Sequence, residues 1–184
     1  MSGPATLAQL AAALPGVLAA PKTGSAVEML CLRPGYGQRD FVDEITVTKA
    51  GGIPGERWST APWVKLADGQ GDPGIQVSIL PSRVLDLVWR DRAGTIHPGD
   101  TFVCDLDTSE ANLPEGQLLS VGTAVLTVSG IFNDGCAKWK VRYGEAAYDW
   151  VRAPEHRQYR LRGVLCSVQV DGVIRTGDPV RVLR

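Results

Sequence analysis

The sequence predicts a mainly β protein in which a mostly antiparallel sheet closes into a barrel, with a few helices at its periphery. Short segments that alternate apolar and polar residues recur from residue 26 to residue 183, and turn formers separate most of them. Few long helices are expected between successive strands, which favours antiparallel pairing. Closing such a sheet into a barrel would protect its edge strands.

The alternating segments predict the strands in order along the chain. A long loop is expected over residues 50–74, which are rich in glycine and proline. In the segment 158–171 the apolar positions change phase near Gly163, which predicts a bulge there. The predicted strands are residues 26–32, 41–49, 76–80, 101–106, one within 116–131, 158–171, 173–175 and 180–183.

Three amphipathic segments predict helices. Residues 1–20 form a helical extension that packs on the barrel domain, residues 21–184, and Pro15-Gly16 should end this helix. A second helix follows the third strand, and a third spans about residues 144–153 and ends at Pro154. The side chains expected to face inward are Leu7, Leu10, Ala11 and Leu14 in the first helix, Val84, Leu85, Val88 and Trp89 in the second, and Ala147, Trp150 and Val151 in the third.

Composition narrows the class of protein. A chain of 184 residues is long enough for one stable domain without disulfides. No apolar stretch reaches the ~20 residues of a membrane span. The first cation, Lys22, follows the early apolar segment instead of preceding it, so a secretory signal is not expected and the cytoplasm is predicted. Neither a CxxC pair nor a Cys/His cluster with zinc spacing occurs, which argues against a zinc site.

One of the four cysteines stands apart from the others. Cys31, Cys104 and Cys166 lie in predicted strands, where a cysteine is best interpreted as a small core residue. Cys136 instead follows a turn signal, and Lys138, Lys140 and Arg142 come just after it. If Asp134 caps a short helix, Cys136 lies in its first turn, where the helix end and the cations favour the thiolate. The Asp134 charge opposes this effect, and the spacing also fits a structural cysteine at a strand end.

Charge is unevenly distributed along the chain. The net charge is −1, yet from residue 138 onward ten Lys and Arg residues face five Asp and Glu. Because these cations lie near Cys136, they suggest an anionic small-molecule ligand rather than a nucleic acid, which usually requires an excess of positive charge over the whole domain. A solvated charged face is the alternative interpretation.

Four sequence blocks, in their order and spacing, resemble a known family. They are residues 51–58 (GGIPGERW), 76–80 (QVSIL), 135–139 (GCAKW), and 160–163 (RLRG) followed by Gly177-Asp178. The chain resembles a MOSC domain, the module named after the C-terminal part of molybdenum-cofactor sulfurases, from about Pro21 to the C-terminus. The resemblance implies a β-rich barrel with one functional cysteine, which matches Cys136. In the family this cysteine carries sulfur as a persulfide or ligates molybdenum in a pterin cofactor.

These inferences lead to a function hypothesis. Cys136 is the expected catalytic nucleophile or molybdenum ligand, in a sulfur transferase that needs no pyridoxal phosphate or in a molybdenum-cofactor-dependent reductase. The expected partners are an anionic small molecule or the pterin cofactor, together with a sulfur-donor or reductase protein. The side chains expected to hold the anion are Arg57, Lys138, Arg142, Arg160 and Arg162, of which Arg160 and Arg162 would project from one strand face.

Two alternatives stay open. In the family a Pro-His pair often precedes the cysteine, whereas this chain has Phe132-Asn133-Asp134, which removes an acid or base. A barrel that binds a small anion or a partner and has lost the chemistry is therefore the alternative function, and the arginines would then simply face water. Further expectations are that His97 lies near the site, that Asp100 and Asp178 are structural, and that Trp58, Trp63 and Trp139 line an opening or pack.

Overall fold

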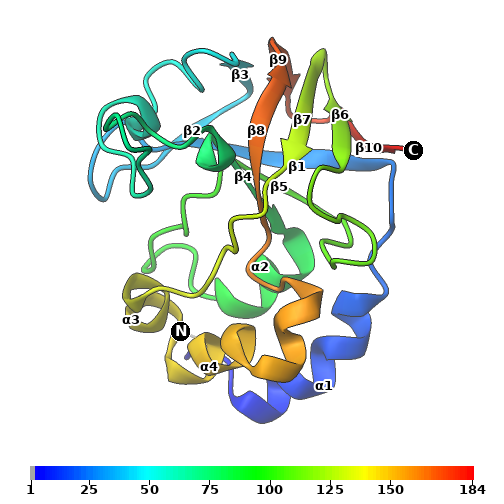
Figure 1. Cartoon of the computed structure of the whole chain (residues 1–184). Coiled ribbons are helices and arrows are strands. Elements are labelled where there is room, and N and C mark those ends of the chain that lie inside the picture. The colour runs from blue at the N-terminus through cyan, green and yellow to red at the C-terminus, as the bar shows by residue number, and fades with distance from the viewer. Residues whose placement is uncertain (1–2) are drawn as a thin grey trace.

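Seven β-strands within residues 3–184, the part of the chain that this computed structural model describes, close into a barrel (Figure 1). Around the barrel the order is β10-β6-β7-β8-β4-β5-β1, and pairing of β1 with β10 closes it. Only β4 and β5 pair in parallel, so the mainly β, mostly antiparallel barrel is confirmed. The strands are β1 (Ser25–Leu32), β4 (Val77–Pro81), β5 (Phe102–Cys104), β6 (Leu118–Val121), β7 (Ala124–Val128), β8 (Val164–Val170) and β10 (Pro179–Leu183).

Alternate side chains of these strands fill the barrel. In β7 the side chains of Ala124, Leu126 and Val128, which share one face, are buried and belong to the core inside the barrel. The region 116–131 forms two strands where one was predicted, because Gly122, with φ of 57°, allows a tight turn between β6 and β7.

The predicted strand over residues 41–49 is divided. It forms β2 (Asp40–Val42), which extends the sheet beyond β1, and β3 (Glu44–Val47), which pairs with β9 (Gly172–Arg175) in a separate two-stranded ribbon. Alternation alone does not reveal that a strand changes partners at Asp43, because both halves keep the same period.

Four α-helices within the described residues gather at one end of the barrel (Figure 1). They pack through a second apolar cluster, and the predicted inward residues of α2 and α4, together with Trp89, are buried. The short helix that the sequence offered on condition of an Asp134 cap forms over residues 137–143. The helices are α1 (Leu7–Leu18), α2 (Ser82–Val88), α3 (Ala137–Tyr143) and α4 (Glu145–Arg152). Within residues 3–184 none of them has both the length and the apolar character that a membrane crossing requires.

The first helix is longer than expected and buries a different set of residues. It begins with a capping box, in which Thr6 and Gln9 exchange hydrogen bonds. It then continues through Pro15 to Leu18 instead of ending there. The buried residues are Leu10 and Val17, whereas Leu7 is exposed. Proline removes one backbone hydrogen bond, and packing of Val17 against the helical cluster offsets that loss.

Residues 158–163 are not part of a strand, so the predicted bulge near Gly163 is wrong. A 3-10 helix, η3 (Pro154–Tyr159), precedes Arg160, which adopts a left-handed conformation with φ of 46°. β8 begins at Val164, so the change of phase marks a boundary between elements. The irregularity in the β7–β8 pairing lies instead between Val125 and Leu126.

The glycine-rich segment forms a lobe beside the barrel, as the long-loop prediction implied (Figure 1). It contains two short 3-10 helices, η1 (Arg57–Ser59) and η2 (Pro73–Ile75). The Trp58 indole donates a hydrogen bond to the Asp72 carbonyl at 2.9 Å and thereby joins the two ends of the lobe. Trp58 therefore packs within the lobe.

Candidate functional site

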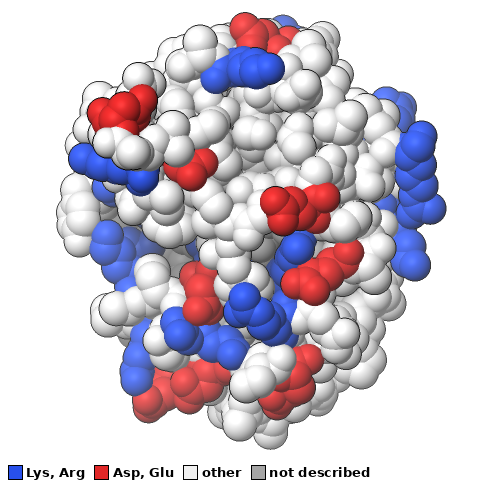
Figure 2. Space-filling view, viewed as in Figure 1, with Lys and Arg blue, Asp and Glu red and all other residues white. Residues whose placement is uncertain are grey.

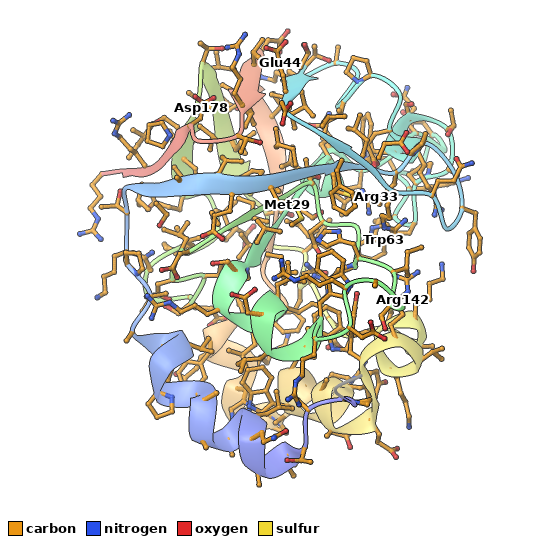
Figure 3. All side chains as sticks on the ribbon, turned by 180° about the vertical axis from the view of Figure 1, so that it is seen from behind. Met29, Arg33, Glu44, Trp63, Arg142 and Asp178 are labelled. Carbon is orange, nitrogen blue, oxygen red and sulfur yellow. The ribbon has the colours of Figure 1, made fainter. Side chains whose placement is uncertain are left out.

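A cavity of about 610 Å³ lies where the lobe, the helical layer and one end of the barrel meet. In the space-filling view Lys and Arg atoms lie at the rim of a recess between the lobe and the helices α3 and α4, with some Asp and Glu atoms among them (Figure 2). In the view from behind, Arg33, Trp63 and Arg142, which come from three distant segments, lie one above another (Figure 3). A cavity of this volume accommodates a cofactor-sized ligand.

Positive charge dominates the cavity wall. Seven cationic side chains line it, against the two carboxylates of Asp100 and Asp134. Such an excess in a concave, partly desolvated site concentrates positive potential and attracts anions. The cations are Arg33, Arg39, Arg57, Lys138, Arg142, Arg152 and Arg162.

Cys136 lies on the cavity wall and is exposed. It is the N-cap residue of α3 rather than a first-turn residue, and its carbonyl accepts hydrogen bonds from the Trp139 and Lys140 amides at 2.9 and 3.2 Å. Asp134 does not cap the helix, which corrects the expectation. Its carboxylate accepts from the Gly135 amide at 2.7 Å and pairs with Arg152 at 3.0 Å.

Two side chains from other elements hold the loop that carries Cys136. The Arg152 guanidinium, at the end of α4, donates to the Gly135 carbonyl at 2.8 Å. The Asn133 amide donates to the Arg162 carbonyl at 3.0 Å. Gly135 itself is buried, and a Cβ there would lie 3.0 Å from a methyl group of Val151, so the close approach of this loop to α4 favours glycine.

Besides Arg152, two of the lining arginines form ion pairs. Arg33 binds the buried carboxylate of Glu56 through Nε at 2.8 Å and Nη2 at 3.0 Å, and its backbone amide also donates to Glu56. Burial opposes the charge of Arg33, but the bonds to Glu56 outweigh it and raise the pKa of the guanidinium. Arg162 binds both oxygens of buried Asp100 at 2.8 and 2.9 Å and lies over the Trp139 ring. These pairs fix the cavity wall and carry little net charge.

Arg39 and Arg142 lack such compensation. Arg39 donates to the carbonyls of His97 and Pro98 at 3.0 and 2.9 Å, and Arg142 reaches the same two carbonyls at 3.5 and 3.4 Å. Among the described residues neither guanidinium has a carboxylate within ion-pair distance. Burial, and then the charge of Arg142, lower the pKa of Arg39. An anion bound between them would relieve this repulsion.

The cavity mouth combines aromatic rings with cations. Lys138 Nζ lies 4.2 Å from the centroid of the Tyr36 ring, and the Arg57 guanidinium carbon lies 5.9 Å from it. Trp63 lines the cavity and is 63% exposed. The mouth is therefore formed by the loop that contains Tyr36, by the lobe and by α3.

Comparison with known proteins identifies the family. The family model of the MOSC domain matches residues 67–181, which is more than half of the chain. The chain belongs to the MOSC domain family. This family is associated with molybdenum cofactor binding or with sulfur-related function. No curated protein sequence gives a significant match.

Solved MOSC-domain structures share the fold. The YuaD protein of Bacillus subtilis is 21% identical with a TM-score of 0.62, covering 86% of this chain and 94% of its own. YiiM from Escherichia coli is 17% identical with a TM-score of 0.53, covering 88% and 69%, and YiiM from Geobacillus stearothermophilus is 17% identical with a TM-score of 0.50, covering 88% and 73%. At these identities the likeness establishes the barrel architecture.

The MOSC barrel brings most of the predicted site residues together, and one lies elsewhere. Cys136, Arg57, Lys138, Arg142 and Arg162 line the cavity. Arg160 does not, because its left-handed backbone directs it to the Leu113 carbonyl, to which it donates at 2.7 Å, and toward Glu110 at 3.7 Å. Three lining cations were not predicted, Arg33, Arg39 and Arg152. The turn-rich segment 33–39, with an arginine at each end, was the signal that could have revealed two of them.

The remaining expectations divide between site and packing. Trp63 and Trp139 line the MOSC cavity, whereas Trp58 does not. Asp178 is structural as expected, since it accepts from the Arg175 amide at 2.7 Å. Asp100 instead binds Arg162 in the cavity wall. His97 is buried between Phe41 and Trp89, and only its backbone carbonyl reaches the site arginines. Within the described residues no cluster of three or more His, Cys, Asp or Glu side chains is placed to bind a metal ion.

Proposed function

We propose that this MOSC protein binds a molybdenum-pterin cofactor in the cationic cavity, with the thiolate of Cys136 as a ligand of the metal. The observation that carries the proposal is the combination of an exposed thiol and an uncompensated pair of guanidiniums, Arg39 and Arg142, on the wall of one cofactor-sized cavity. A bare sulfur carrier needs only the accessible thiol, so the large cationic cavity favours the cofactor.

The residues present fit such a group. A thiolate is a soft ligand suited to a thiophilic metal, and a lone protein thiolate suits a metal whose other ligands come with its cofactor. Guanidiniums are planar donors that match phosphate oxygens in a bidentate manner. Arg39 and Arg142 would hold the anionic part of the cofactor, and Cys136 the metal. When bound, the group supplies a centre that exchanges two electrons with a substrate.

The protein's own contribution is positioning and charge. The pairs Arg33–Glu56 and Arg162–Asp100 make the cavity wall rigid, because each joins segments distant in sequence. Arg152 neutralises Asp134 and fastens the Gly135 carbonyl, so the thiol is presented from an anchored loop. Because the cavity is partly closed to water, the cations act on a bound anion with little screening.

A sulfur-transfer role is the second candidate, favoured by the exposure of Cys136 to incoming proteins. In that role the Cys136 thiolate attacks the outer sulfur of a donor persulfide, a new S–S bond forms at Cys136, and the donor cysteine leaves as its thiolate. The exchange needs no external oxidant. A barrel that binds anions without chemistry is the third, favoured because no histidine lines the cavity within the described residues and both lining carboxylates are ion-paired.

Metal and sulfur analysis of the purified protein separates these functions. We expect about one molybdenum atom per chain after expression in a host that makes the cofactor, with strong loss in Cys136→Ser and no loss in Lys140→Gln. Lys140 is the matched control because it lies on the same helix but pairs with Glu145 outside the cavity. Cyanide-labile sulfur without molybdenum would favour sulfur transfer and contradict the cofactor proposal. Absence of both would favour the non-catalytic barrel.

A further inference from the structure

The two most exposed aromatic side chains in the described part of the molecule lie at the same place, the cavity mouth. Tyr36 is 77% exposed and Trp63 is 63% exposed. Trp63 lines the cavity directly. Tyr36 reaches the mouth through the lining residues Arg57 and Lys138, which lie against its ring.

Packing does not account for this exposure. The other aromatic rings of the wall are buried, such as Trp139 and Tyr143, which pack edge to face with ring centroids 4.8 Å apart. Trp58, on the same lobe as Trp63, packs against Gly52 and Gly71. Exposing two large rings to water is unfavourable, and both rings border a site that is otherwise charged.

The two cations beside these rings are free to bind an anion. Neither Arg57 nor Lys138 has a carboxylate within ion-pair distance among the described residues. Their charges lie against the Tyr36 ring, which weakly stabilises a cation but does not neutralise it. A ligand that carries one negative charge and one flat apolar surface would satisfy both the cations and the rings.

We propose that the mouth of the cavity binds planar aromatic anions, such as aryl carboxylates, which stack on Trp63 and Tyr36 while their acidic group pairs with Arg57 and Lys138. The inference rests on the proposed function in one respect, because it takes the planar aromatic anion to be the substrate of that function. The cofactor is assigned to the other cations, Arg39 and Arg142. The rings select flat ligands, because stacking needs a π-surface, and the cations select acidic ones.

Binding of planar aromatic anions at the cavity mouth is tested with small-molecule probes. Calorimetry with 2-naphthoate is compared with its neutral analogue 2-naphthamide and with the non-aromatic cyclohexanecarboxylate. The variants are Trp63→Ala and Tyr36→Ala for the rings and Lys138→Gln for the charge. Phe41→Ala is the control, because Phe41 is 52% exposed but lies outside the cavity lining. Since the substituted side chains are exposed, all four variants should keep the fold.

We expect 2-naphthoate to bind the wild type more tightly than either analogue. Each ring variant should weaken 2-naphthoate by about three- to tenfold and leave cyclohexanecarboxylate unchanged. Lys138→Gln should weaken 2-naphthoate and leave 2-naphthamide unchanged, and Phe41→Ala should match the wild type. Wild-type affinity in both ring variants would overturn the proposal, as would an equal loss in Phe41→Ala.

Molybdenum content distinguishes this inference from the proposed function. Trp63→Ala should retain the wild-type metal content, because the proposed aromatic site does not use Arg39 or Arg142. Loss of metal in Trp63→Ala would show that the ring holds the cofactor, which overturns the substrate site and leaves the cofactor proposal standing. Binding of 2-naphthoate through Trp63 in a protein that never acquires molybdenum would support the aromatic site and contradict the cofactor proposal.

Discussion

At the scale of single residues, Cys136 differs from the other cysteines in access to solvent. Burial raises the pKa of Cys31 to about 11 and that of Cys166 to about 12, and it raises the pKa of Cys104 as well. A raised thiol pKa keeps the group protonated at neutral pH, and only the thiolate reacts. Cys136 is therefore the only cysteine placed for chemistry on an external ligand.

Alkylation should distinguish the four thiols. With iodoacetamide at pH 8 the native protein, expressed without the cofactor, should gain one adduct, at Cys136, and the urea-unfolded protein four. Raising the pH to 9 should not change the number of adducts in the native protein, because pH 9 is still below the raised pKa values of the three buried thiols. Intact mass and peptide mapping measure the result, and Cys136→Ser should gain no adduct. A second adduct in the native protein would contradict the assignment.

The uncompensated arginines should matter more than paired ones. Arg39→Gln and Arg142→Gln should each lower retention of the pterin by about tenfold, since a charge-assisted hydrogen bond contributes ~1.5–3 kcal/mol. Pterin fluorescence per mole of protein after oxidation measures retention. Arg175→Gln is the control, because Arg175 pairs with Glu44 in the ribbon of β3 and β9, outside the cavity lining. Equal loss in the control would indicate a general effect of charge.

Sequence reasoning found the residues whose signal is local. Cys136 could be singled out because its neighbours in sequence are also its neighbours in space. Arg33, Arg39 and Arg152 were missed because long-range folding brings them to the cavity, and no periodicity marks such residues. Arg160 was assigned to the site because a strand was assumed, whereas a left-handed residue redirects its side chain.

At the scale of elements, strands and helices with a clear period could be predicted, and their ends could not. The predicted inward faces of α2 and α4 agree with the structure because burial follows the period closely in these helices. Boundaries failed where backbone conformation decides them. Gly122 turns one expected strand into two, and Arg160 with Gly163 delays the start of another expected strand to Val164.

Gly163 should be one of the least replaceable glycines. Its φ is 83°, and an added Cβ would lie 1.9 Å from the Ile79 carbonyl oxygen, a backbone atom of β4. Gly163→Ala should lower the free energy of unfolding by about 3 kcal/mol or more, because strain and clash add. Gly177→Ala, with similar φ and open space around it, should cost about 1 kcal/mol. Urea denaturation measures both, and equal losses would contradict the packing of β8 against β4.

At the scale of the whole molecule, the cavity exists because barrel, lobe and helical layer meet at one place. Four of its cations come from the basic C-terminal third and three from the acidic remainder of the chain. The charge asymmetry therefore predicted an anion site but only part of its composition. The contact of barrel, lobe and helical layer at the cavity depends on tertiary topology. The resemblance to MOSC domains indicated that topology, whereas the residue patterns did not.

Buried His97 should also make the free energy of unfolding depend on pH. His97 packs between Phe41 and Trp89, and burial, more than the nearby arginines, lowers its pKa to about 4 from 6.5. The unfolded state then binds the proton first as pH falls. The contribution of His97 to stability is therefore full above pH 6.5 and is lost as pH falls toward 4, by up to about 3 kcal/mol.

Comparison with His97→Gln isolates this effect. Urea denaturation between pH 7 and 4 should show a smaller fall in the variant than in the wild type, because glutamine does not titrate. Carboxylates that titrate in the same range contribute to both proteins and cancel in the difference. Parallel curves for the two proteins would show that His97 is accessible to protons in the folded state.

The central claim is that the Cys136 sulfur ligates molybdenum in the cationic cavity, and X-ray absorption at the molybdenum edge tests it most directly. The account predicts that the metal in the wild type has one more sulfur neighbour than the residual metal in Cys136→Ser, and that Lys140→Gln equals the wild type. An unchanged sulfur count in Cys136→Ser would contradict the claim.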